Sequence, residues 1–227
     1  MNSKWLNKML FAIGIWGTSS AVMTVLYKKA NHTHKNGFDG IALTFDDGPH
    51  PLYTPKLLDL LKKYDVKATF FVVGQQAQLY PEIIQRMQEE GHAIGIHHYR
   101  HTSNWLMTPF ASKKEIEKCA NIIHDITGVV PVLYRPPWGH VTPFTALIAK
   151  RYRIVLWTRH FSDWRTSRIQ YTLKNELIKA TKDGSIFLLH DNGQTIGANE
   201  DAPHYMLHHL ESYLRQVAHT TNFVVLR

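Results

Sequence analysis

From residue 38 to the C-terminus, short apolar runs alternate with amphipathic runs, and this alternation constrains the fold more than any other feature of the chain. The runs with strand character are GIALTF, KATFFVVG, HAIGIHH, VLYRPP, IVLWTRHF, SIFLLHD and NFVVLR. The segments between them, such as TPKLLDLLKKY, carry apolar residues at helical spacing. Alternating strands and helices imply parallel strands joined by crossover helices. The sequence therefore predicts an α/β layered or barrel fold, and about seven parallel strands suit an incomplete barrel.

The N-terminal region predicts a membrane-spanning segment. Residues 9–27, MLFAIGIWGTSSAVMTVLY, carry no charge and have lysines on both sides. As a helix this stretch would be about 28 Å long, close to the thickness of about 30 Å of the hydrocarbon core of a bilayer. We predict a short flank over 1–8, a transmembrane anchor over 9–27, a linker over 28–37 and one domain over 38–227. A cleavable signal peptide is the alternative, with SSA (19–21) as a poor cleavage site.

The charge balance limits the possible partners. The chain has 26 basic and 18 acidic residues and a net charge of +8. Such a protein attracts phospholipid headgroups, acidic wall polymers or nucleic acid. The positive charge is dispersed through the helical segments and not gathered in a stripe with aromatic residues, which argues against nucleic acid. A single cysteine, Cys119, excludes an internal disulfide and a cysteine-based zinc site. We infer no obligate protein partner.

Polar side chains follow most of the predicted strands at the same end. In parallel α/β folds the carboxyl ends of the strands meet at one edge, where binding and catalytic groups gather. We therefore predict one site that contains these residues: Asp46 and Asp47 after the first strand, His97 and His101 after the third, Arg135 after the fourth, Asp163 after the fifth and His190 at the end of the sixth.

The two adjacent aspartates in LTFDDGPH (43–50) need a physical reason. Neighbouring like charges raise each other's pKa unless a cation or a proton-transfer task offsets them. A solvated turn is the alternative, because Asp and Gly-Pro are common in turns. Successive strand residues point to opposite faces, so both aspartates can line one pocket only if the chain leaves strand geometry there.

The segment HHYRH (97–101) places two imidazoles four residues apart, within reach of one ion. One aspartate and two histidines suit Zn²⁺, Co²⁺, Ni²⁺ or Mn²⁺. Three protein ligands leave coordination positions open, which is typical of a catalytic site.

The motifs TFDDGP, GHAIGIHHYRH, RPPWG, SDW and LLHD, in this order and spacing, resemble the polysaccharide deacetylase family. These metal-dependent carbohydrate esterases include chitin deacetylases and peptidoglycan N-acetylglucosamine deacetylases. The resemblance covers about residues 38–227. It implies a distorted, incomplete (β/α) barrel. It also implies a hydrolase that removes N-acetyl groups from N-acetylhexosamine residues of a cell-wall polysaccharide, either peptidoglycan or chitin-like oligomers. Zn²⁺ is the expected ion, with Co²⁺, Ni²⁺ or Mn²⁺ as alternatives. We expect the domain on the outer side of the cell membrane, or secreted if the N-terminal segment is cleaved.

The resemblance also implies roles for individual residues. Asp47, His97 and His101 match the metal ligands, and Asp46 matches the general base. Arg135 matches the partner of that base, His190 the general acid and Asp163 the carboxylate that orients His190. The backbone N–H of Trp138 matches the oxyanion donor, and Trp164 and Leu188 match the apolar walls around the acetyl group.

Two positions depart from the family pattern. His98 stands where Ser or Thr is usual, and we expect it to supply a hydrogen bond behind the ligands or to act as an alternative ligand. His160 replaces the first aspartate of the DxxDW pattern, whereas the second is kept as Asp163. Trp105 is a further candidate for the substrate groove. A catalytically inactive sugar-binding relative is the alternative function, although it would not need both a base and an acid.

Overall fold

The structure is a computed structural model that describes residues 3–33, 38–148 and 151–227. Within these residues one parallel sheet forms the centre of the domain, with strand order β5-β4-β3-β2-β1-β7-β6. The strands are β1 (Ile41–Asp46), β2 (Thr69–Val72), β3 (Ala93–Ile96), β4 (Leu133–Tyr134), β5 (Arg153–Ile154), β6 (Arg159–His160) and β7 (Ser185–His190). The predicted α/β fold with about seven parallel strands in an incomplete barrel is confirmed.

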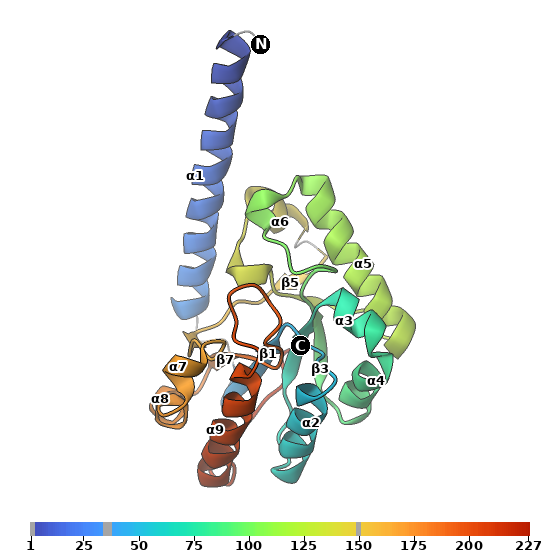
Figure 1. The fold of residues 1–227 in the computed structure, drawn as a ribbon, viewed down its shortest axis with the longest axis vertical. Helices are drawn as coiled ribbons and strands as arrows, with labels where there is room; N and C mark the ends of the chain where they lie inside the picture. Colours follow the sequence, from blue (N-terminus) through green and yellow to red (C-terminus); the bar gives the residue numbers. More distant parts are fainter. Residues whose placement is uncertain (1–2, 34–37, 149–150) are drawn as a thin grey trace.

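Helices surround this sheet (Figure 1). They are α2 (Tyr53–Lys63), α3 (Gly74–Leu79), α4 (Pro81–Glu89), α5 (Pro109–Thr127), α6 (Pro143–Ile148), α7 (Thr166–Ile169), α8 (Leu173–Ala180) and α9 (Ala202–Val217). Helix α2 illustrates the packing, because Leu57, Leu58 and Leu61 are fully buried whereas Lys62 and Lys63 are exposed. The burial of such apolar faces is the main term that holds the helices to the sheet.

Strand β1 lies in the middle of the sheet and is buried along its whole length. It pairs with β2 on one edge and with β7 on the other. In this register Asp46 lies opposite His190, so the carboxyl ends of β1 and β7 reach the edge of the sheet together. This arrangement brings side chains that are far apart in the sequence to one place.

Two strand predictions differ from the structure. The run 154–161 was predicted as one strand, but it contains the end of β5 and all of β6. The run 222–227 forms no strand of the sheet within the described residues. Phe223 makes a single parallel bridge with Ile41, and the Val224 N–H donates to the Ile41 carbonyl at 2.9 Å. Strand β7 pairs along the whole of β1 and β2 pairs with Thr44–Asp46, so the C-terminal segment meets β1 at the start of that strand.

Helix α1 (Ser3–Thr33) is longer than the predicted anchor. Residues 28–33, predicted as part of a linker, continue the helix, and residues 34–37 of that linker lie outside the described residues. By length and composition, the segment Leu6–Ala30 is able to cross a membrane. The N-terminal part of α1 projects beyond the domain, whereas its C-terminal part lies beside it (Figure 1).

Candidate active site

The first residues of the site come from the turn that ends β1. Asp46 is the last residue of the strand, and Asp47 leaves strand geometry with a φ of 79°. Gly48 follows, where a Cβ atom would collide with the Asp191 carboxylate. Because of this turn, both aspartates line the same cavity.

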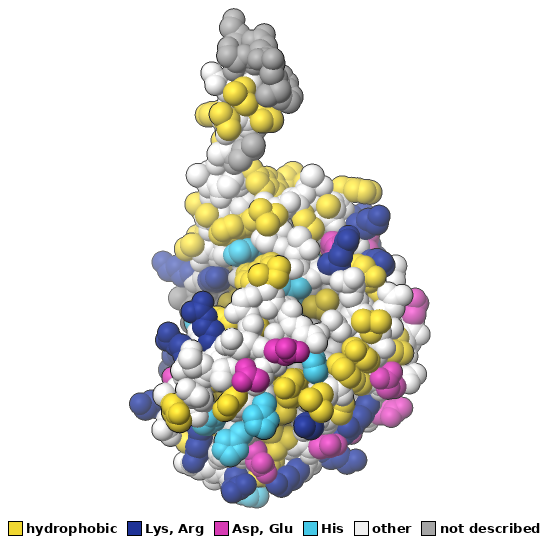
Figure 2. All heavy atoms as spheres, in the orientation of Figure 1, with side chains coloured by type: hydrophobic (Ala, Val, Ile, Leu, Met, Phe, Trp, Pro, Cys, Tyr) yellow, Lys and Arg dark blue, Asp and Glu magenta, His cyan; other side chains and the backbone are white. Residues whose placement is uncertain are grey.

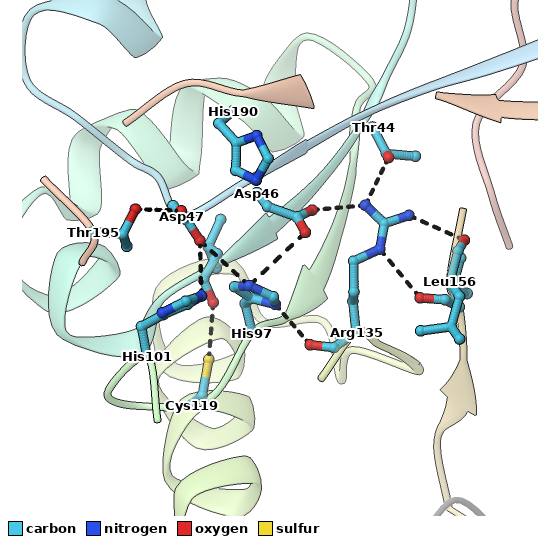
Figure 3. Close-up of polar contacts among 12 residues, drawn as sticks. Thr44, Asp46, Asp47, His97, His101, Cys119, Arg135, Leu156, His190 and Thr195 are labelled. Atoms are coloured by element: carbon cyan, nitrogen blue, oxygen red, sulfur yellow. Dashed lines mark hydrogen bonds and ion pairs between the residues drawn. The ribbon is translucent and has the colours of Figure 1, made fainter. Parts of the chain in front are cut away.

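Asp47, His97 and His101 converge at the carboxyl edge of the sheet (Figure 3). Nε2 of His97 and Nε2 of His101 each lie 3.3 Å from Oδ1 of Asp47. This Oδ1 atom is buried and accepts no hydrogen bond from the part of the chain that the structure describes. Oδ2 of the same carboxylate accepts a hydrogen bond from the Thr195 hydroxyl at 2.7 Å. A buried carboxylate oxygen without a donor is costly, and a cation between the three residues would compensate it.

His97 and His101 are oriented so that they could bind a cation. Nδ1 of His97 lies 2.7 Å from the Arg135 carbonyl oxygen. Because a carbonyl only accepts, this Nδ1 carries the proton and Nε2 presents its lone pair toward Asp47. Burial lowers the pKa of His101 to about 4, so its imidazole is neutral at physiological pH. One carboxylate and two imidazoles fit a divalent cation of the zinc type.

Asp46 is held by a buried arginine. The Arg135 side chain is fully buried, and its Nη1 donates to Asp46 Oδ1 and to Thr44 Oγ1, each at 2.7 Å. The same guanidinium donates to the carbonyls of Val155 and Leu156 at 3.1 and 3.3 Å. The bond from Arg135 fixes Oδ1 of Asp46, which leaves Oδ2 as the atom that can accept a proton.

His190 and Asp163 form a second pair at the same edge. Nδ1 of His190 lies 2.9 Å from Asp163 Oδ1, and the backbone N–H of His190 donates to Oδ2 at 2.7 Å. Burial alone would lower the pKa of His190, but the Asp163 carboxylate, helped by Asp47 and Asp46, raises it to about 9. His190 is therefore protonated at neutral pH, with Nδ1 engaged and Nε2 free to donate a proton.

A cavity of about 450 Å³ joins these groups. Trp138, Trp164 and Leu188 all line it, together with His160. The ring of Trp138 lies edge-on to His101 with centroids 4.2 Å apart, and Trp164 lies edge-on to His190 at 5.2 Å. The three predicted substrate-contacting residues therefore line the same cavity as His101 and His190.

His98 does not point into the cluster. Nε2 of His98 lies 2.7 Å from the Tyr134 hydroxyl, and Nδ1 lies 2.9 Å from the Thr102 carbonyl oxygen. Burial lowers the pKa of His98 to about 3, so the ring is neutral. Nδ1 donates to the carbonyl and Nε2 accepts from the hydroxyl, which leaves neither nitrogen for a cation. The expected alternative in which His98 is a ligand is wrong, and its imidazole instead fixes the loop that carries His97 and His101.

Trp105 contacts helix α1. It stacks on His140 with centroids 4.0 Å apart, and its Nε1 donates to Thr24 in α1 at 3.3 Å. It is absent from the lining of the described cavity. Its side chain packs between α1 and the loop that follows Gly139, so the place of Trp105 in the substrate groove stays a prediction.

Sequence reasoning missed four residues of the site. Thr195 supports Asp47, Asp191 packs under Gly48, and Trp157 and Lys28 line the cavity. Asp191 belongs to the LLHD motif, so its position was visible in the sequence although its packing was not. The other three lie outside the motifs, and no spacing pattern links them to the ligands.

Comparison with known proteins identifies the class. The family model described as polysaccharide deacetylase matches residues 33–157. A peptidoglycan-N-acetylglucosamine deacetylase of Bacillus cereus is 40% identical over 172 residues, which cover 70% of this chain and 77% of the relative. The chain belongs to the polysaccharide deacetylase family, a class of hydrolases, as the five motifs predicted.

Two further matches extend this finding. The peptidoglycan-N-acetylmuramic acid deacetylase PdaC of Bacillus subtilis is 38% identical over 151 residues, but the match spans only 32% of that longer protein. The structure of the Bc1960 peptidoglycan N-acetylglucosamine deacetylase is 32% identical with a TM-score of 0.74, and the alignment covers 83% of this chain and 89% of that one. The structural likeness therefore extends over most of the chain.

Proposed function

We propose that this protein is a metal-dependent deacetylase that removes N-acetyl groups from N-acetylhexosamine residues of peptidoglycan. One observation carries the proposal: a three-ligand cluster, a buried Asp46–Arg135 pair and a protonated His190–Asp163 pair share one cavity. A protein that only binds sugar needs neither a base nor an acid, whereas amide hydrolysis needs both. The names of the relatives support peptidoglycan as the polymer.

Asp47, His97 and His101 would hold the metal, and Zn²⁺ is the ion that we propose. The donor set supports this choice, because a carboxylate with two imidazoles is a known arrangement for catalytic zinc with open positions. A divalent cation held there supplies Lewis-acid chemistry, since it polarises a carbonyl group and acidifies water.

Asp46 acts as the general base in this proposal. Its Oδ2 takes the proton of the attacking water while Arg135 holds Oδ1. The oxygen of the water forms a bond to the acetyl carbon. Positioned bases of this kind typically contribute about 10²- to 10⁴-fold in rate.

His190 acts as the general acid. As the bond between the acetyl carbon and the amide nitrogen breaks, Nε2 of His190 gives its proton to the leaving nitrogen. The products are acetate and a free amine on the sugar. Asp163 keeps Nδ1 engaged, so the proton that is transferred comes from the nitrogen that faces the cavity.

Trp138, Trp164 and Leu188 position the acetyl group. Leu188 is buried, and Trp164 flanks His190, so both offer apolar contact to the methyl group. The backbone N–H of Trp138 donates to the developing oxyanion. Support comes from the place of this residue in the cavity lining and from its φ of 55°, which turns the RPPWG loop at this position. Removal of such a donor typically costs about 10²- to 10³-fold in rate.

The test is acetate release by the full chain in detergent. The protein is stripped of metal, resupplied with Zn²⁺, Co²⁺ or Mn²⁺, and given N-acetylglucosamine oligomers or peptidoglycan. We expect metal-dependent release of acetate. No release with any metal, despite stoichiometric metal binding, would refute the proposed activity and favour the sugar-binding alternative.

We also infer that α1 is retained and anchors the domain outside the cell membrane. Trp16 Nε1 donates to the Trp105 carbonyl at 3.3 Å, and its ring lies 5.7 Å from that of Phe144. Further along the helix, Ser20 and Thr24 are buried against the domain. Cleavage near residues 19–21 would remove the Trp16 contacts, so the packing supports an uncleaved helix.

The same packing limits how the anchor enters the bilayer. The segment from Ser3 to Ile15, which precedes the first domain contact, is about 20 Å long at about 1.5 Å per residue. This is shorter than the hydrocarbon core of about 30 Å. Exposed apolar side chains, including Leu106, Phe144 and Leu147, occupy the neighbouring end of the domain, where hydrophobic atoms gather beside α1 (Figure 2). We infer that this end of the domain is immersed in the membrane interface.

The intact mass of protein extracted from membranes tests the anchor. We expect a chain that includes residues 1–21 and that remains in the membrane fraction after an alkaline wash. A chain trimmed near residue 21 and found in the medium would refute retention.

A further inference from the structure

Helix α1 contributes a side chain to the cavity. Thr24 Oγ1 donates to the Val141 carbonyl at 3.0 Å and accepts from the Val141 N–H at 2.9 Å. Val141 lies two residues beyond Gly139, in the loop that carries Trp138. One turn after Thr24, on the same face of the helix, Lys28 reaches the cavity that also contains the metal-ligand cluster.

The Lys28 ammonium has a defined position. Its Nζ lies 5.5 Å from the ring centroid of Trp157, within the range of a cation–π contact. Its Cε lies 3.4 Å from the place where a Cβ atom of Gly139 would be. The side chain is half-buried, and both neighbours hold it at the wall of the cavity.

The charge of Lys28 has no carboxylate partner in the described ranges of the chain. The carboxylates that line the cavity are Asp46, which pairs with Arg135, and Asp47, which faces the two histidines. Two further cations line the cavity: the protonated His190, which pairs with Asp163, and the exposed Arg165. Because a half-buried ammonium is more stable beside an anion, this part of the cavity favours a negatively charged group on the ligand.

We propose that Lys28 binds a carboxylate of the glycan substrate, so that the protein prefers a carboxylated wall glycan to a neutral chitin-like oligomer. This inference rests on the proposed function, because its ligand is the proposed substrate. Peptidoglycan offers two sources of the carboxylate: the lactyl group of N-acetylmuramic acid and the stem peptide. A chitin-like chain offers neither.

Binding measurements separate this proposal from the proposed activity. Asp46→Asn in the zinc-loaded full chain removes the base and leaves the metal ligands in place, so affinity is measured without hydrolysis. Isothermal titration uses three probes: a neutral N-acetylglucosamine tetramer, peptide-free peptidoglycan strands with free lactyl carboxylates, and strands that carry stem peptides. Lys28→Gln is compared with Lys29→Gln, which removes the same charge from an exposed neighbour outside the lining of the cavity.

We expect Lys28→Gln to weaken binding of a carboxylated glycan about tenfold, the effect of one charge-assisted hydrogen bond. Affinity for the neutral tetramer should change by less than about twofold, and Lys29→Gln should leave the affinity for all three probes within the same limit. Lys28→Arg should keep most of the preference, because it keeps the charge.

Each outcome decides the proposal. Loss of affinity only for peptide-free strands assigns the lactyl carboxylate, and loss only for peptide-bearing strands assigns the stem peptide. An equal loss for the neutral tetramer, or no loss for either carboxylated glycan, overturns the proposal. If unsubstituted protein releases no acetate but the binding difference persists, the proposed function fails and the carboxylate site stands.

Discussion

Substitution of Asp163 by Asn isolates the group that keeps His190 protonated. Asn has nearly the same size as Asp, and its amide can still bond to the backbone N–H of His190, so the fold is kept while the charge is lost. The Asp163 carboxylate is the largest influence that raises the pKa of His190 to about 9, against burial that lowers it. Without this carboxylate, we expect the pKa of His190 to fall to its ordinary value of about 6.5 or below.

This fall in the pKa of His190 corresponds to a free-energy change of about 3 kcal/mol, at about 1.36 kcal/mol for each pKa unit. The protonated form is the active acid, so activity should be lost as pH rises through the pKa of His190. At pH 8 the protonated fraction falls from about 0.9 to about 0.03, which predicts a loss of about 30-fold in kcat/KM from protonation alone. Below pH 6 the two proteins should be much closer in activity.

The assay is acetate release at saturating zinc from pH 5 to pH 10. The unsubstituted protein and Asp163→Asn are assayed with the same cation. The difference between the alkaline limbs of their pH profiles therefore measures the effect of the Asp163 carboxylate. Asp183→Asn, an exposed residue, is the control for loss of one carboxylate and should leave the profile unchanged. If Asp163→Asn lowers activity equally at all pH values and keeps its alkaline limb near pH 9, the assigned role of Asp163 is refuted.

Four further predictions test the remaining groups. Asp46→Asn should keep the bound metal but lower kcat by about 10²- to 10⁴-fold, and full turnover would contradict its role as the base. His101→Ala should lose metal on dialysis, and full metal content would contradict its role as a ligand. Arg135→Met leaves the Asp46 charge buried without its partner, so the free energy of unfolding in urea should fall by about 3–5 kcal/mol. A fall of less than about 1 kcal/mol in this free energy would show that the pair is not structurally important. His98→Ser should keep the metal but lower Tm, because the Tyr134 O–H loses its acceptor and the Thr102 carbonyl loses its donor. Loss of metal would contradict the geometry.

The sequence alone predicted the architecture because hydrophobic periodicity is a local property. Apolar runs of strand length alternate with amphipathic helices, and parallel order follows from that alternation. The same order places the residues that follow the strands at one edge of the sheet, so Asp46, His97, Arg135 and His190 were expected together. Adjacent residues such as Asp46 and Asp47 need only a turn to share a pocket.

Strand boundaries were harder to predict from the sequence. The segment 222–227 has strand composition, but within the described residues it makes only a single bridge, at Ile41, because β7 pairs along all of β1 and β2 takes the other edge from Thr44 onward. The run 154–161 contains parts of two strands for the same reason: pairing depends on which neighbours are available and not on composition.

Only the tertiary structure decided the roles of side chains whose partners lie far along the chain. His98 directly follows His97, a proposed ligand, yet its nitrogens bond to Thr102 and Tyr134. Lys28 reaches the cavity because Thr24 bonds to Val141, a residue 117 positions away. Sequence periodicity does not predict such a contact. The contact depends on the fit between two surfaces that form only when the whole chain has folded.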